Sequence, residues 1–149
     1  MALDQSFIGR SYPTELRYEV GAEKIREFAD AIGDLSPVYR DVAAARAAGH
    51  PTVIAPPTFT TIINLRIIEA IVADPALGLD WSRVVQGEQT FTHHRPVRAG
   101  DSLGWVATIE NVMNRGGHGF MTVRADISDA DDQPVAVVAA TVVVRGDEA

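Results

Sequence analysis

The residues of this chain that are best suited to chemistry lie in the stretch Asp34-Leu35-Ser36-Pro37-Val38-Tyr39-Arg40-Asp41. Asp34 can exchange a proton, and Tyr39 stands five positions later, where acid–base chemistry would place a histidine. A tyrosine hydroxyl has a pKa of about 10, too high for an efficient general base at neutral pH, whereas that of histidine is about 6.5. The stretch therefore indicates an acid–base motif whose base has been replaced. The alternative is a structural Asp34 that caps a helix exit or accepts hydrogen bonds within its loop.

The four histidines are the other candidates for proton transfer or ligand contact. His50 lies in the loop before a long apolar segment, where it could touch a ligand. His93 and His94 are adjacent at the end of an expected strand, so their side chains should face opposite sides and not share one site. We expect a surface or interface role for both. His118 lies in a glycine-rich turn and should be solvated, and no group of histidines and carboxylates has the spacing of a metal site.

The composition indicates one globular domain over residues 1–149 and limits its partners. Hydrophobic residues make up 46% of the chain and charged residues 22%, which is enough apolar surface for a core. A net charge of −7 makes nucleic acid and anionic membranes poor partners. The absence of cysteine excludes disulfides, thiolate catalysis and cysteine-bound metals. The sequence has no signal-peptide pattern and no apolar run of about 18 to 20 residues, so we expect a cytoplasmic protein.

The first half of the chain shows two patterned segments and a loop. Residues 15–20 alternate between apolar and charged side chains, which is typical of a half-buried strand. Residues 25–32 place apolar side chains at i, i+3, i+4 and i+7, which predicts an amphipathic helix, and Gly33 follows where a left-handed cap would end it. Residues 34–57 contain four prolines and no clean period, so we expect an ordered loop with one helical turn at 43–48.

The second half predicts a long helix followed by strands. Residues 58–73 are apolar around nearly the whole helical wheel, which is typical of a buried helix, and Pro57 suits its first turn. Apolar patterning predicts strands at 84–92, 103–112, 120–127 and 135–144, separated by turn-forming residues. The last strand is apolar almost throughout, as in a central strand covered on both faces. The order of elements predicts an α+β fold whose antiparallel sheet wraps the buried helix.

Two further segments match a known family when they are taken together with the Asp34 stretch. They are Ile54-Ala55-Pro56-Pro57-Thr58-Phe59 and His94-Arg95-Pro96-Val97-Arg98-Ala99-Gly100-Asp101. Over residues 5–145 the chain resembles the MaoC-like hotdog-fold family of (R)-specific enoyl-thioester hydratases and 3-hydroxyacyl-thioester dehydratases, which are lyases. It is most similar to the N-terminal-type MaoC domains and to the non-catalytic subunits of heterodimeric hydroxyacyl-carrier-protein dehydratases. The resemblance implies a single hotdog fold with an antiparallel sheet around a long central helix.

The chain departs from the catalytic pattern of this family at two places. The family signature resembles Asp-x-Asn-Pro-hydrophobic-His-x-Asp, and here Ser36 replaces the Asn and Tyr39 replaces the His. Catalytic members read Ile-Ala-His-Gly before the central helix, and here Pro56 and Pro57 replace the last two residues. Proline has no N–H to polarise a thioester oxygen, and losing such a donor typically costs about 100 to 1,000-fold in turnover. The two departures argue against an autonomous hydratase.

The resemblance implies a subunit that pairs with a catalytic MaoC-like subunit, which supplies the Asp–His pair. The two hotdog sheets would meet edge to edge and share an acyl tunnel that Thr58 and Phe59 help to shape, with His50 and Pro57 near the ligand. The ligand would be an acyl group on coenzyme A or acyl carrier protein, as in fatty acid metabolism, with no metal and no redox cofactor. The apolar strand at 135–144 has no charged or proline guard, which indicates a free sheet edge and a dimer instead of a stable monomer.

Two other functions fit the same residues. One is a catalytically silent acyl-binding or scaffold homodimer, in which Asp34 is vestigial or only binds water. The other is an active hydratase or thioesterase that uses Asp34 with an unconventional partner such as His50.

Overall fold

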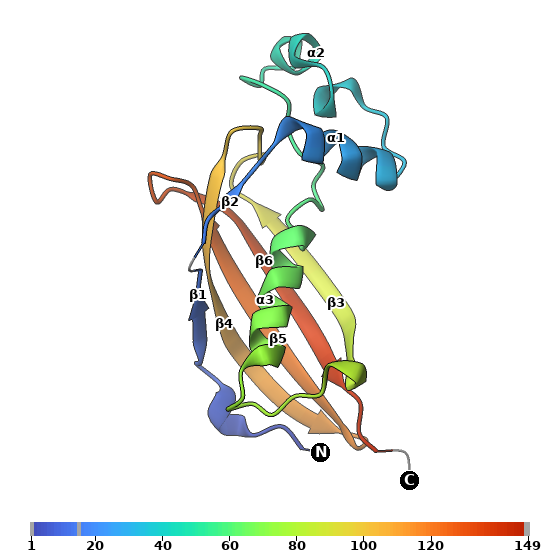
Figure 1. The fold of residues 1–149 in the computed structure, drawn as a ribbon, viewed down its shortest axis with the longest axis vertical. Helices are drawn as coiled ribbons and strands as arrows, with labels where there is room; N and C mark the ends of the chain where they lie inside the picture. The colour runs from blue at the N-terminus through green and yellow to red at the C-terminus, as the bar shows by residue number, and fades with distance from the viewer. Residues whose placement is uncertain (1, 15, 148–149) are drawn as a thin grey trace.

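The computed structural model describes residues 2–14 and 16–147, and its main feature is an antiparallel sheet with one long helix on its face (Figure 1). The sheet has the order β1-β4-β5-β6-β3, and β2 pairs with β4 off this path. In chain order the elements are η1 (Gln5–Phe7), β1 (Ser11–Pro13), β2 (Tyr18–Glu19), α1 (Ala22–Ala31), η2 (Pro37–Tyr39), α2 (Val42–Ala47), α3 (Thr61–Ala73), η3 (Trp81–Arg83), β3 (Val84–His93), β4 (Ser102–Arg115), β5 (His118–Ser128) and β6 (Pro134–Val144), where η marks a 3-10 helix. This arrangement confirms the predicted α+β fold.

The four long strands form where the sequence shows strand patterning. The predicted strands at 84–92, 103–112, 120–127 and 135–144 are confirmed as β3, β4, β5 and β6. Along β5 and β6 nearly every second side chain is buried, and Val123, Ile127 and Val138 are at most 2% exposed. The buried face of the sheet and α3 therefore provide much of the core.

β6 lies inside the sheet, which corrects the expectation of a free edge along residues 135–144. It pairs with β5 on one side and with β3 on the other, so both of its edges are hydrogen-bonded. β3 pairs only with β6 and forms an edge of the described sheet. Its ten residues include one carboxylate, Glu88, and no lysine, arginine or proline. The unguarded edge of this fold is therefore β3.

α3 crosses the face of the sheet and is buried on one side only (Figure 1). Ile63, Ile67 and Ile71 recur every fourth residue, face the sheet and are at most 2% exposed. On the opposite side Leu65 is 52% exposed, and Glu69 is also exposed. The expectation of a helix buried all round is therefore wrong for this chain, because the sheet covers a single side of it.

The structure starts α3 three residues later than the sequence predicts, at 61 instead of 58. Residues 57–60 form turns, in which the Phe59 N–H donates to the Pro56 carbonyl at 2.9 Å. Pro57 therefore lies in a turn before the helix and not in its first helical turn. Phe59 anchors this turn, because its buried ring packs edge-on against Tyr18 and Phe28, with centroids 6.3 and 5.5 Å away.

The N-terminal half forms two short strands and two short helices. Residue 15 lies outside the described part of the chain, and β2 covers only 18–19 of the strand predicted at 15–20. α1 confirms the predicted amphipathic helix, and Gly33 after it has a φ of 74°, which favours glycine. α2 confirms the predicted helical turn, and the Asp41 carboxylate caps it by accepting from the Ala43 N–H at 2.8 Å. Within residues 2–14 and 16–147 no helix is long and apolar enough to span a bilayer.

Candidate functional site

A cavity of about 370 Å³ opens beside the turn that leads into α3. Its walls come from segments that are distant in the sequence: η2, the chain before α3, the end of β3 and the corner after β3. The lining residues are Tyr39, Ile54, Ala55, Pro57, His93, His94, Arg95, Pro96 and Val97. Its volume is typical of small-molecule sites, which usually measure about 300 to 1,000 Å³. We call it the Tyr39 cavity.

Tyr39 keeps its proton at neutral pH. Burial raises the pKa of its hydroxyl, and the nearby Asp34 carboxylate raises it further. The hydroxyl can therefore donate a hydrogen bond but cannot serve as a base. Asp34 itself stabilises its loop, because its carboxylate accepts from the Ser36 N–H at 3.1 Å and its own N–H donates to the Ala29 carbonyl at 2.9 Å. The structural role considered for Asp34 is thus present in the fold.

Arg40 holds the Asp34 loop against α1. Its guanidinium donates to the Asp30 carboxylate at 2.6 Å and to the Asp34 carbonyl at 2.7 Å. The side chain is 25% exposed, so this ion pair is partly shielded from water. Because Arg40 directly follows Tyr39, these contacts also fix the place of Tyr39 on the cavity.

His93 and His94 both line the Tyr39 cavity, which corrects the expectation that they could not share a site. β3 ends at His93, so the alternation of side chains along a strand does not extend to His94. The His93 Nε2 lies 2.8 Å from the Pro57 carbonyl oxygen, so this nitrogen carries the proton and donates it. The contact ties the end of β3 to the turn before α3. Both side chains are exposed in this chain, as expected for surface residues.

Three other residues predicted to contact a ligand lie outside this lining. His50 follows α2, where its N–H donates to the Ala45 carbonyl at 3.0 Å. Thr58 is exposed on the turn before α3, and Phe59 is buried in the core. Their contacts with a ligand stay predictions, because a tunnel between two chains needs a second chain.

Arg95 is a charged residue of the lining to which the sequence assigned no role. Its guanidinium donates to both oxygens of Asp101, at 2.8 and 2.9 Å, and to Asp129 at 3.3 Å. The bonds to Asp101 are the main reason that the pKa of Arg95 is raised. Asp101 is 7% exposed and also accepts from the Arg98 N–H at 2.9 Å, while Gly100 takes a φ of 89°. The Pro-Val-x-x-Gly-Asp motif therefore builds and fixes this corner of the cavity.

A second polar group lies between α3 and the edge strand β3. The Asn64 amide donates to Gln86 at 3.3 Å, and the Thr61 hydroxyl donates to Gln89 at 3.2 Å. The Thr60 Oγ1 and the Gln89 Nε2 are buried without a hydrogen-bond partner among the described residues. Buried polar atoms are normally paired, so these two atoms are exceptions within the described part of the chain. The apolar pattern of the helix gave no signal for this cluster.

The Tyr39 cavity can hold a small, mostly apolar group, but its acid–base chemistry is limited. The imidazoles of His93 and His94 are the groups of the lining that belong to the type most often used as a general base. His93 is engaged by the Pro57 carbonyl, which leaves His94. Pro57 itself contributes an acceptor and no N–H, so it cannot polarise a carbonyl group.

The comparisons with known proteins agree with the fold. A family model described as "FAS1-like, dehydratase domain region" matches residues 6–138. A UPF0336 protein of Saccharopolyspora erythraea is 56% identical over 146 residues, which cover 98% of this chain and 94% of that protein. A solved MaoC-like dehydratase is 31% identical, with a TM-score of 0.83, over 95% of this chain and 43% of that longer chain. The HadBC (3R-hydroxyacyl-ACP dehydratase) complex from Mycobacterium tuberculosis is 28% identical, with a TM-score of 0.85, over 96% of this chain and 99% of the matched chain.

Proposed function

The chain belongs to the MaoC-like dehydratase family of hotdog proteins, and we propose that it is a non-catalytic subunit of a (3R)-hydroxyacyl-thioester dehydratase or (R)-enoyl-thioester hydratase. Its partner would be a catalytic MaoC-like subunit that supplies the Asp–His pair. The acyl group would arrive on coenzyme A or acyl carrier protein and lie in a tunnel that both chains line.

The observation that carries this proposal is the protonated Tyr39 on the cavity. Adding water to an enoyl thioester needs one group that takes a proton from water and another that protonates the α-carbon. Tyr39 stands where the family has its histidine, and burial and Asp34 move its pKa further from neutrality. Pro57 adds a second defect, because the turn before α3 presents its carbonyl to His93 and has no N–H at this residue for a thioester oxygen.

The edge strand β3 supports pairing with another hotdog chain. Within the described residues its outer side has no neighbouring strand, and it lacks the lysine or proline that usually blocks such an edge. A second sheet docked along β3 would extend the hydrogen-bond ladder. The Tyr39 cavity, at the end of β3, would then open beside the junction.

The test is to co-express the chain with a MaoC-like protein that keeps the catalytic histidine, and to assay enoyl-thioester hydration by each chain and by the pair. We expect co-purification, and activity that needs both chains. Glu88→Lys on the β3 edge should weaken the pairing, because a lysine there opposes strand addition. Asp126→Lys on β5, which pairs with β4 on one side and β6 on the other, is the matched control. A chain that only self-associates and leaves the partner unchanged would favour the silent homodimer.

A second candidate is an active hydratase or thioesterase, which the position of His94 favours. His94 lines the same cavity as Tyr39, whereas His50, the partner considered from the sequence, does not. In this case His94 would take the place of the family histidine, and Asp34, which is not a lining residue, would act only through Tyr39. The test is to measure turnover by the isolated chain. This activity would be established if His94→Gln abolished the turnover and His118→Gln left it unchanged.

A further inference from the structure

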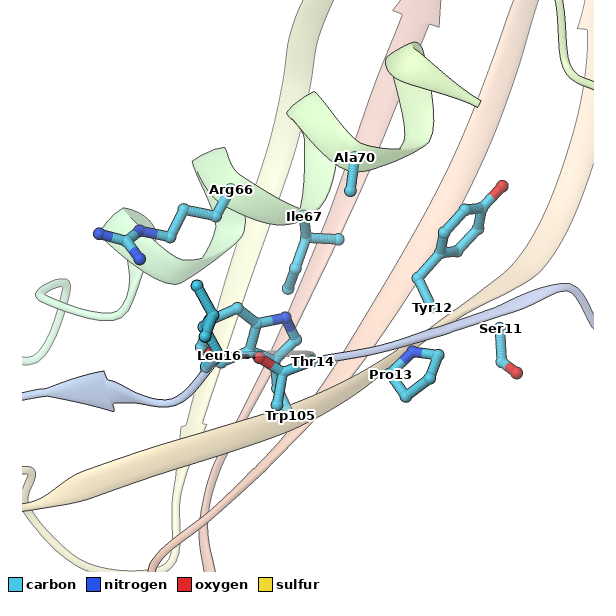
Figure 2. A pocket seen from close by; sticks show the side chains of 9 residues that line it. All are labelled: Ser11, Tyr12, Pro13, Thr14, Leu16, Arg66, Ile67, Ala70 and Trp105. Carbon is cyan, nitrogen blue, oxygen red and sulfur yellow. Dashed lines mark hydrogen bonds between the residues drawn. The ribbon is translucent and has the colours of Figure 1, made fainter. Parts of the chain in front are cut away.

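A second hollow, of about 470 Å³, runs along the side of α3 that faces β1 (Figure 2). α3 forms one wall with Arg66, Ile67 and Ala70, and β1 with the chain after it forms the other. Trp105 of β4 lies between the two walls. We call this hollow the α3–β1 groove. It shares no lining residue with the Tyr39 cavity, so it is a separate site.

The middle of the α3–β1 groove is apolar. Figure 2 shows Ile67 and Ala70 pointing from α3 toward the side on which Trp105 lies. Leu16 and Trp105 both line the groove, and Leu16 is 80% exposed. Exposed apolar side chains gain free energy when an apolar chain covers them. The groove is therefore suited to an apolar ligand segment.

Arg66 places a positive charge at one end of this groove. Its guanidinium carbon lies 5.0 Å from the centre of the Tyr18 ring, a cation–π contact that orients it. Within residues 2–14 and 16–147 no carboxylate lies within ion-pair distance of Arg66. Further along the groove, the Asp74 carboxylate accepts hydrogen bonds from Arg10 at 2.8 Å and from the Tyr12 hydroxyl at 2.7 Å. Its negative charge is therefore already paired with Arg10. Among the described lining residues Arg66 is the charged one, so the complementary ligand group is an anion.

We propose that the α3–β1 groove binds the anion of a carboxylic acid with an apolar chain. The carboxylate would pair with the planar guanidinium of Arg66, and the chain would lie over Ile67, Ala70 and Trp105. A thioester of the same chain carries no charge at its carbonyl, so the groove selects the free acid over the acyl thioester. The site does not depend on the proposed dehydratase role, because the Tyr39 cavity lies elsewhere.

Decanoate and its uncharged analogue decanol are suitable probes at pH 7.5. Calorimetry on the unmodified chain measures both affinities, and Trp105 fluorescence in a Trp81→Phe variant reports contact with the groove, because these are the two tryptophans. We expect saturable decanoate binding with a Kd below about 1 mM. Decanol should bind about tenfold more weakly, as the loss of a charge-assisted hydrogen bond requires.

Variants separate this groove from the rest of the surface. Arg66→Gln should weaken decanoate binding about tenfold and leave decanol binding unchanged, and Arg66→Lys should restore part of the loss. Ala70→Leu fills the groove and should abolish binding of both probes. Arg115→Gln, an exposed arginine at the far end of β4, and Tyr39→Phe in the other cavity should change neither affinity.

Several results would overturn the proposal. They are equal affinity for decanoate and decanol, unchanged decanoate binding in Arg66→Gln or Ala70→Leu, and no decanoate binding up to about 1 mM. Loss of decanoate binding in Tyr39→Phe would place the ligand in the Tyr39 cavity and would equally refute it. None of these outcomes bears on whether the chain pairs with a catalytic subunit.

Discussion

Replacing Asp101 with asparagine tests whether the corner beside the Tyr39 cavity depends on a shielded ion pair. Asp101 is 7% exposed and accepts from Arg95 at 2.8 and 2.9 Å and from the Arg98 N–H at 2.9 Å. Asparagine keeps one acceptor oxygen and turns an NH2 group toward the guanidinium, so at least one charge-assisted hydrogen bond, about 1.5 to 3 kcal/mol, is lost. Arg95 retains Asp129 at 3.3 Å, which limits the loss. We expect the free energy of unfolding to fall by about 2 to 3 kcal/mol.

Urea unfolding followed by tryptophan fluorescence measures this change, and the same loss should lower Tm by about 4 to 12 °C. Asp126→Asn is the matched control, because Asp126 is 59% exposed and pairs with the exposed Arg124 at 3.1 Å. An exposed pair of this kind should change the free energy by less than about 1 kcal/mol. The double variant Arg95→Gln, Asp101→Asn should lose less than the sum of the two single variants, since both remove one interaction. Equal losses in Asp101→Asn and Asp126→Asn would show that the corner does not depend on a shielded ion pair.

Three further predictions follow from the same structure. The isolated chain should hydrate crotonyl-type thioesters several orders of magnitude more slowly than catalytic relatives, and a steady-state turnover above about 10 per second would contradict this. Tyr39→His should raise hydration modestly while changing the free energy of unfolding by less than about 2 kcal/mol, and Tyr39→His with Pro57→Gly should exceed the sum of the single effects, as measured by initial rates. A folded double variant with the parent's activity would show that the missing chemistry lies elsewhere. Burial and Asp74 raise the pKa of Tyr12 to about 12, above its usual 10, so its contribution to stability should be complete below pH 10 and lost as the pH rises through about 12. Unfolding at a series of pH values should show that Tyr12→Phe removes this part of the alkaline loss, and an unchanged profile would contradict the assignment.

Local patterns in the sequence were enough to predict the main elements, and they also suggest the defect in the motif, which stays a prediction. Strand patterning located β3 to β6, helical spacing located α1, and Gly33 marked its end, because these signals depend on residues close together in the chain. The replacement of the expected histidine by Tyr39 is also visible in one stretch of the sequence. The structure adds that burial and Asp34 raise the pKa of this hydroxyl, which local sequence cannot show.

Which edges and faces stay open, and which residues meet at the site, depends on contacts between distant segments that the sequence does not show. Apolar patterning reports that residues 135–144 are buried but not that β3 covers their outer edge, so the free edge was misplaced. The same pattern could not reveal that the sheet covers a single side of α3, which leaves Leu65 exposed. His93 and His94 both line the Tyr39 cavity because β3 ends at His93. The backbone bends after it, so neighbouring side chains no longer point to opposite faces of a strand. The periodicity of apolar residues indicates which side chains are buried. The order of the strands and the ends of the elements determine which other residues cover those side chains.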